Sequence, residues 1–148
     1  MPRLFVLDAS VAGKWYLNDE DLVDQAEKLL KSFLQNEIEL YAPILLKYEP
    51  AQLLYKAQRF SRKVKQENCE KAYKHFCSLP IIYHQFNDRI MREILSFAIK
   101  FNKSFYDCCY ICLANALNCQ WITDDREYER RLPAGFPKER ILMLKTFK

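Results

Sequence analysis

Short apolar runs alternate with longer helical patterns from one end of the chain to the other. Runs of this length, apolar on both faces, are typical of buried strands. The predicted strands are residues 4–8, 38–43, 81–85, 119–124 and 141–147. Because neither face is polar, we expect other elements to cover the sheet on both sides.

Between these runs, apolar side chains recur at spacings of three and four residues, which is the period of an amphipathic helix. The first such pattern contains Leu22, Ala26, Leu29, Leu30 and Phe33. The other predicted helices are residues 45–65, 67–77, 90–101 and 107–117. Strands that alternate with helices predict an α/β fold with a parallel sheet. We find no repeat or Gly/Ser linker and expect one domain over residues 1–148.

Composition supports a folded domain and restricts its location. Half of the 148 residues are hydrophobic and 14% are aromatic, which is globular composition. Only four apolar residues separate Arg3 from Asp8, too few for a signal-peptide core. The apolar runs are also far shorter than the roughly 20 residues that cross a bilayer. We therefore expect a cytoplasmic protein without a membrane partner.

The six cysteines are expected to be reduced, because no export signal accompanies them. Cys109 and Cys112 form a CxxC inside an apolar helical pattern, but the chain has no second CxxC. A zinc site is therefore disfavoured, and we expect these thiols to pack in the core.

Several common site motifs are missing. Gly13 and Gly135 are the only glycines, so neither a GxGxxG nor a GxxxxGK[ST] loop is present. The chain also lacks a GxSxG motif, which disfavours a serine hydrolase of the type that uses this motif. Nucleotide-binding and serine-hydrolase classes are therefore poorly supported.

Carboxylates instead recur near the predicted strand ends: Asp8, Glu49, Asp107, Asp124 and Asp125. In a parallel sheet these positions can meet at one edge. Gathered carboxylates repel one another unless a cation balances their charge. Mg²⁺ and Mn²⁺ prefer oxygen ligands and bind beside phosphates, so the pattern indicates phosphodiester chemistry.

Each acid also has a purely structural interpretation. Asp8 or Ser10 could cap the next helix, and Asp107 completes a capping-box pattern that begins at Ser104. Glu49 could be an exposed helical acid, and the aspartate pair could form a turn with an N-cap. The residues alone leave both interpretations open.

Four segments together resemble the acidic motifs of the PIN-domain ribonucleases, and in particular of VapC-type toxins from toxin–antitoxin pairs. These segments are "LFVLDASV", "YAPILLKYEPAQLL", "FYDCCYICLANA" and "WITDDREY". The resemblance implies a three-layer α/β/α sandwich with a mainly parallel sheet, and cleavage of single-stranded RNA with Mg²⁺ or Mn²⁺. It also implies a homodimer and a small antitoxin partner.

The resemblance places the metal-binding and catalytic acids on Asp8, Glu49, Asp107 and one acid of "TDD", with Ser10 and Thr123 in supporting positions. Side chains alternate along a strand, so Thr123 and Asp125 share a side and Asp124 faces away. We therefore expect Asp125 to be the ligand and Asp124 a turn-stabilising acid.

Pro50 directly follows Glu49 and lacks the N–H that a helix interior uses. The helix is therefore expected to begin close to Glu49 or to bend there.

A net charge of +4 is compatible with an anionic partner. The predicted RNA or partner contacts are Lys56, Arg59, Arg62, Lys63 and Arg126, with Phe60, Lys65, Arg130 and Arg131 nearby. A solvated helix face is the other interpretation of such a charge run.

A second functional hypothesis is a catalytically idle PIN-like module that dimerises and binds a partner. Its acids would serve as caps, and its interface candidates are Tyr48, Tyr55, Phe60, Tyr73 and Phe76.

Overall fold

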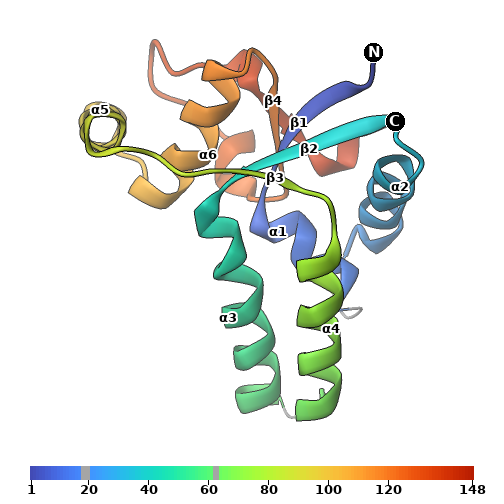
Figure 1. Cartoon of the computed structure of the whole chain (residues 1–148). Helices are drawn as coiled ribbons and strands as arrows, with labels where there is room; N and C mark the ends of the chain where they lie inside the picture. Colours follow the sequence, from blue (N-terminus) through green and yellow to red (C-terminus); the bar gives the residue numbers. More distant parts are fainter. Residues whose placement is uncertain (18–20, 62–63) are drawn as a thin grey trace.

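A five-stranded sheet forms the centre of the computed structural model, which describes residues 1–17, 21–61 and 64–148 (Figure 1). Its strands are β1 Arg3–Leu7, β2 Ile38–Pro43, β3 Ile82–His84, β4 Gln120–Thr123 and β5 Ile141–Met143. They are ordered β3-β2-β1-β4-β5, and every pairing is parallel. The predicted α/β class and the mainly parallel sheet are confirmed.

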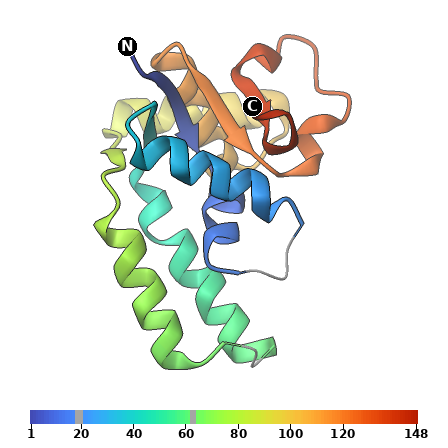
Figure 2. The same cartoon turned by 90° about the vertical axis from the view of Figure 1, so that its right-hand side faces the viewer.

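Helices cover both faces of this sheet. The helices of the described chain are α1 Ala9–Ala12, α2 Val23–Leu34, α3 Glu49–Lys56, α4 Gln66–Ser78, α5 Asp88–Phe101 and α6 Phe105–Ala116. Figure 2 looks onto the face that α2 covers, with α5 and α6 behind the sheet. Helices α3 and α4 lie side by side and extend away from the sheet, beyond the ends of β1 and β2 (Figures 1 and 2). This arrangement is a three-layer α/β/α sandwich with a projecting helix pair.

Short helical turns complete the described chain. They are η1 Gly13–Trp15, η2 Ile44–Lys47, η4 Arg126–Glu129, η5 Lys138–Arg140 and η6 Leu144–Thr146, all of 3-10 type, and the π-helical η3 Ala57–Ser61. No helix in the described segments combines the length and hydropathy that a bilayer crossing requires.

The prediction of one helix over residues 45–65 is wrong. The segment divides into η2, α3 and η3, and its residues 62–63 lie outside the described part of the chain. Pro50 explains the first division, because it lacks the N–H needed for a continuous helix and is tolerated only in the first turn. Helix α3 accordingly begins at Glu49, as its proline predicts.

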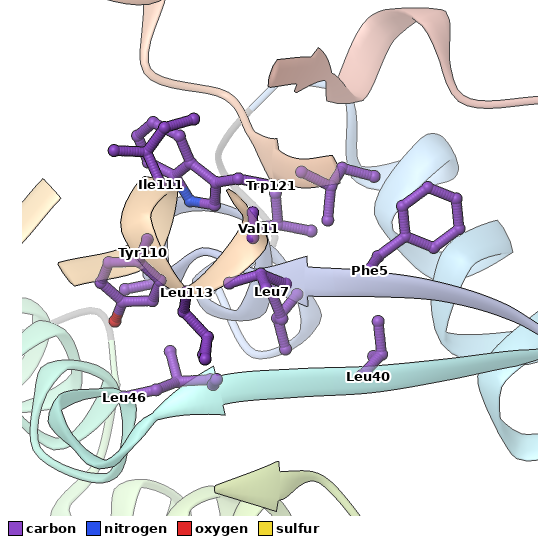
Figure 3. Packing of buried hydrophobic residues seen from close by; sticks show 14 of the residues in the cluster. Phe5, Leu7, Val11, Leu40, Leu46, Tyr110, Ile111, Leu113 and Trp121 are labelled. Carbon is purple, nitrogen blue, oxygen red and sulfur yellow. The ribbon is translucent and has the colours of Figure 1, made fainter. Parts of the chain in front are cut away.

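Buried side chains fill the space between α6 and the sheet (Figure 3). Leu7 of β1, Leu40 of β2 and Trp121 of β4 are fully buried, and Tyr110 of α6 is 1% exposed. Cys108 and Cys109 are buried in α6, and Cys112 is half-buried. Burial raises the pKa of Cys109 to about 11, so this thiol stays protonated near neutral pH. The predicted packing of the α6 thiols is confirmed.

Candidate metal centre

Asp8 lies at the carboxyl end of the central strand. Its backbone N–H donates to the carbonyl of Ile122 at 3.1 Å, which extends the pairing of β1 with β4 by one residue. Its side chain is also the N-cap of α1 and accepts the backbone N–H of Ser10 at 3.2 Å. The capping interpretation of Asp8 is therefore correct, and it does not exclude a second role.

The carboxylate of Asp8 is surrounded by donors although the residue is only 7% exposed. Its Oδ2 accepts from the hydroxyls of Ser10 at 2.5 Å and Thr123 at 3.1 Å. Its Oδ1 accepts from Nε1 of Trp121 at 3.2 Å. Burial raises the pKa of Asp8, and these hydrogen bonds oppose that shift because they favour the carboxylate.

Glu49 is brought to the site by the turn that follows β2. It is the first residue of α3, where Pro50 fits because no backbone N–H is needed. Its Oε1 accepts a hydrogen bond from the hydroxyl of Tyr110 at 2.7 Å. Burial raises the pKa of Glu49 to about 7, and the negative charges of Asp8 and Asp107 add to the shift.

Asp107 stands in the first turn of α6. The Ser104 side chain caps this helix and accepts the backbone N–H of Asp107 at 3.3 Å. Oδ2 of Asp107 accepts from the hydroxyl of Tyr128 at 2.9 Å. Burial raises the pKa of Asp107 to about 6, with further contributions from the charges of Asp8, Asp125 and Glu127.

Asp125 and Glu127 complete the group. Within the described residues, one carboxylate oxygen from each of Asp107, Asp125 and Glu127 lies within 4.8 Å of the others. Asp125 caps η4 by accepting the backbone N–H of Glu127 at 3.0 Å. This Asx-type turn places both acids beside Asp107.

Glu127 was missed by the sequence analysis. The structural interpretation of the aspartate pair was a turn with an N-cap, and helical spacing gives no reason to place residues two apart on the same side. The signal in the sequence was Asp125 itself, because an aspartate that accepts the N–H two residues later forms a turn that brings Glu127 to the same side. Nζ of Lys103 lies 2.6 Å from Oε1 of Glu127, so this acid already has a cationic partner.

Asp124 has different surroundings from its neighbour. Its Oδ2 lies 3.0 Å from Nζ of Lys14, whose side chain is 3% exposed. Its backbone N–H donates to the hydroxyl of Ser10 at 2.9 Å. Asp124 therefore pairs with a buried cation, whereas Asp125 lies in a cluster of acids.

These acids fit a hard divalent cation, because every donor is a carboxylate oxygen. Asp8 and Glu49 do not belong to the 4.8 Å group. They are nevertheless coupled to it by charge, since Asp8 raises the pKa of Asp107 and Asp107 raises the pKa of Glu49. The site therefore concentrates negative charge in a half-buried place, where a cation would lower the repulsion.

Of the predicted basic contacts that the structure describes, Lys56 and Arg59 lie away from the acids. Lys56, Arg59 and Lys65 are exposed around the tips of α3 and α4, and Phe60 is 76% exposed among them. Arg62 and Lys63 lie outside the described residues.

Arg126 is nearer the acids, and one of its terminal nitrogens lies 2.7 Å from Oδ2 of Asp21. Together with Asp124, Arg130 and others, it lines a cavity of about 370 Å³ beside the site.

The chain matches a known family. A family model of the PIN domain matches residues 5–131, which is most of the chain. The chain belongs to the PIN-domain family. The match spans β1 to η4 and therefore includes all the acids described above.

Solved structures show the same fold at low sequence identity. PAE2754 from Pyrobaculum aerophilum is 22% identical with a TM-score of 0.67, and the match covers 99% of this chain and 94% of that one. VapC20 from Mycobacterium tuberculosis, a toxin that cleaves the sarcin-ricin loop, is 14% identical with a TM-score of 0.63, covering 92% and 98%. A toxin–antitoxin complex from Klebsiella pneumoniae is 9% identical with a TM-score of 0.57, covering 94% and 96%. No curated protein matches significantly.

Proposed function

We propose that the chain is an endoribonuclease that uses Mg²⁺ or Mn²⁺ to hydrolyse phosphodiester bonds of single-stranded RNA, as the toxin of a toxin–antitoxin pair. The observation that carries the proposal is the gathering of acids from separate segments at the ends of β1 and β4, within a PIN domain. Burial raises the pKa of Glu49 and of Asp107, and the charges of neighbouring acids add to both shifts, so a bound cation would favour the carboxylate form of each.

In this proposal Asp8, Glu49, Asp107 and Asp125 are the catalytic acids and hold the metal. A bound divalent cation supplies Lewis-acid activation of a phosphate ester and neutralises developing charge. The chain's own residues orient the carboxylates and limit access of bulk water to them.

Ser10 and Thr123 act indirectly in this proposal. Both hydroxyls donate to Oδ2 of Asp8, and the two hydroxyl oxygens lie 3.4 Å apart. The Thr123 hydroxyl also accepts the backbone N–H of Asp125 at 3.1 Å. Ser10 and Thr123 therefore link Asp8 to Asp125 through hydrogen bonds.

Exposed cations supply the proposed RNA or partner contacts. Lys56 and Arg59 accompany Phe60, whose ring is available for stacking on a base. Lys63 and Arg62 keep their assignment on sequence grounds, and Arg126 borders the acids. Phosphate contacts of this kind depend strongly on salt and little on sequence. RNA as substrate is also consistent with the predicted cytoplasmic location.

We also propose a homodimer and a small antitoxin partner. The similar structure from Klebsiella pneumoniae is itself a toxin–antitoxin complex. Met91, Leu95 and Ile99 leave an apolar stripe exposed on α5, and large exposed apolar patches are usually covered by a partner. Light scattering should give twice the chain mass of 17.7 kDa. A mass equal to one chain would contradict the homodimer.

The idle-module hypothesis has one observation in its favour, since Asp8 and Asp125 do cap helices. Capping does not require the burial of Asp8, and it gives no role to Glu49, which caps no helix and accepts a hydrogen bond from Tyr110 beside the other acids. Phe76 is buried and cannot contribute to the partner interface of an idle module, whereas Tyr48, Tyr55 and Phe60 are exposed. The nuclease proposal accounts for more of the site.

Cleavage of mixed single-stranded RNA with millimolar Mg²⁺ or Mn²⁺ tests the proposal. Asp8→Asn and Asp107→Asn should each abolish cleavage, as should EDTA, because each removes part of the charge that holds the metal. Asp88→Asn is the matched control, since Asp88 is an exposed acid in the first turn of α5. If both site variants cut RNA as fast as the unmodified protein, the proposed nuclease site is wrong.

A further inference from the structure

Three buried aromatic side chains pack against one another beneath the acids. Tyr110 comes from α6, Trp121 from β4 and Tyr128 from η4, and they are 1%, 0% and 4% exposed. The rings of Tyr110 and Trp121 are stacked with centroids 6.1 Å apart, and Figure 3 shows both at the interface of α6 with the sheet. Trp121 and Tyr128 meet edge to face at 4.8 Å.

Each ring donates one hydrogen bond to a different acid. Tyr110 donates to Glu49 at 2.7 Å, Trp121 to Asp8 at 3.2 Å and Tyr128 to Asp107 at 2.9 Å. The three acids come from different elements and are far apart in the sequence. One packed group of rings is therefore bonded to three of the four proposed metal ligands.

We propose that Tyr110, Trp121 and Tyr128 act as a single positioning cluster that sets the relative placement of Glu49, Asp8 and Asp107 for cation binding. The inference rests on the proposed function, because it assigns these acids to a metal. Packed rings have few alternative rotamers, so their donor atoms are fixed relative to one another. Carboxylates that repel each other would otherwise turn apart before a cation arrives.

The hydrogen bonds to Glu49 and Asp107 also leave one oxygen of each acid available for a metal. Tyr110 engages Oε1 of Glu49, and Tyr128 engages Oδ2 of Asp107. Within the described residues, no hydrogen bond engages the other oxygen of either carboxylate. Each hydroxyl thus fixes one oxygen of its acid and leaves the second oxygen available to coordinate.

The simpler alternative is that these are core aromatic residues whose polar atoms merely find partners, as buried tyrosine and tryptophan usually do. The alternatives differ in what removal of one hydroxyl does. Groups that orient metal ligands typically contribute about 10–100-fold to metal affinity. If the hydroxyl only needs a hydrogen-bond partner because it is buried, its removal would affect folding stability and leave metal affinity unchanged.

Mn²⁺ titration by calorimetry on Tyr110→Phe and Tyr128→Phe separates them, because phenylalanine keeps the ring and removes only the donor. We expect the Kd for Mn²⁺ to rise about tenfold or more in each variant. Tyr41→Phe is the matched control, since its hydroxyl donates at 2.9 Å to Glu39, which is not one of the site acids. Its Kd should equal that of the unmodified protein. Melting in EDTA verifies that every variant is folded.

The outcomes distinguish the two proposals. If the unmodified protein binds no Mn²⁺, the proposed function fails. If it binds Mn²⁺ and both site variants bind equally well, the positioning cluster alone is overturned.

A measurement on the unmodified chain tests Trp121, whose replacement would leave a large cavity. The protein has two tryptophans, and Nε1 of Trp15 donates to the carbonyl of Ala26 instead of an acid. With ¹⁵N-labelled tryptophan, Mg²⁺ should shift the indole N–H signal of Trp121 and leave that of Trp15 in place. Trp15→Phe assigns the signals. A stationary Trp121 signal under conditions where calorimetry shows binding would remove Trp121 from the cluster.

Discussion

Neighbouring residues with the same side chain can have opposite surroundings, as Asp124 and Asp125 show. Alternation along β4 predicted that Asp125 shares a side with Thr123, and the structure places Asp125 beside Asp107 and Asp124 against Lys14. β4 ends at Thr123, so both acids lie just beyond the strand, yet their side chains still have different surroundings. The alternation did not reveal the buried cation, because Lys14 is far from Asp124 in the sequence.

Asp125→Asn and Asp124→Asn should therefore fail in different assays. Asp125→Asn should abolish RNA cleavage and leave the melting temperature nearly unchanged, because it removes one of several mutually repelling charges. Asp124→Asn should lower the free energy of unfolding by about 1–3 kcal/mol, since it removes the negative charge that is paired with the buried Lys14. It should retain most of its cleavage below its melting temperature. The converse pattern would make Asp124 the metal ligand.

At the scale of elements, the sequence was informative where apolar periodicity was strong. All five strands, α2, α4, α5 and α6 lie within a few residues of their predicted positions. The short α1 was not predicted, because four residues are too few to show a helical period. The fifth strand was predicted too long, since Leu144–Thr146 forms a 3-10 turn that keeps Leu144 buried without strand pairing.

Helix α6 provides an element-scale prediction, because its N-cap also positions a site acid. Ser104→Ala should cost about 1 kcal/mol of stability through loss of the cap. It should also weaken Mn²⁺ binding, since Asp107 stands in the turn that the cap orders. Asn87→Ala is the matched control, because Asn87 caps α5 by accepting the N–H of Ile90 at 2.9 Å. Equal Mn²⁺ affinity in both variants would show that the cap does not position Asp107.

For the whole molecule, folding itself creates the crowding of charge at the site. Asp8, Glu49 and Asp107 are distant in the unfolded chain and become close and half-buried or buried on folding. The acids could be found from the sequence because each ends or begins an element. Their burial, and the rings that hold three of them, depend on contacts between distant segments that local spacing does not encode.

The burial of these acids, together with their crowding, predicts an unusual dependence of stability on pH in the metal-free protein. The folded-state pKa of Glu49 is raised from 4.5 to about 7, so the folded protein holds this proton more tightly than the unfolded chain does. The stability that Glu49 contributes is then fully present below pH 4.5 and is lost as pH rises through about 7. Asp107 acts in the same direction with its pKa of about 6.

Urea unfolding in EDTA at pH 5 and pH 8 measures this loss. Relative to the unmodified protein, Glu49→Gln should lose less stability between the two values, because glutamine does not ionise. Millimolar Mg²⁺ should restore stability to the unmodified protein at pH 8, with a gain that grows as the logarithm of its concentration. At pH 8 the acids are ionised and can bind the metal. At pH 5 protons compete with Mg²⁺ for the carboxylates, so the gain in stability should be smaller. Identical pH dependence in Glu49→Gln and the unmodified protein would contradict a buried, unbalanced charge at Glu49.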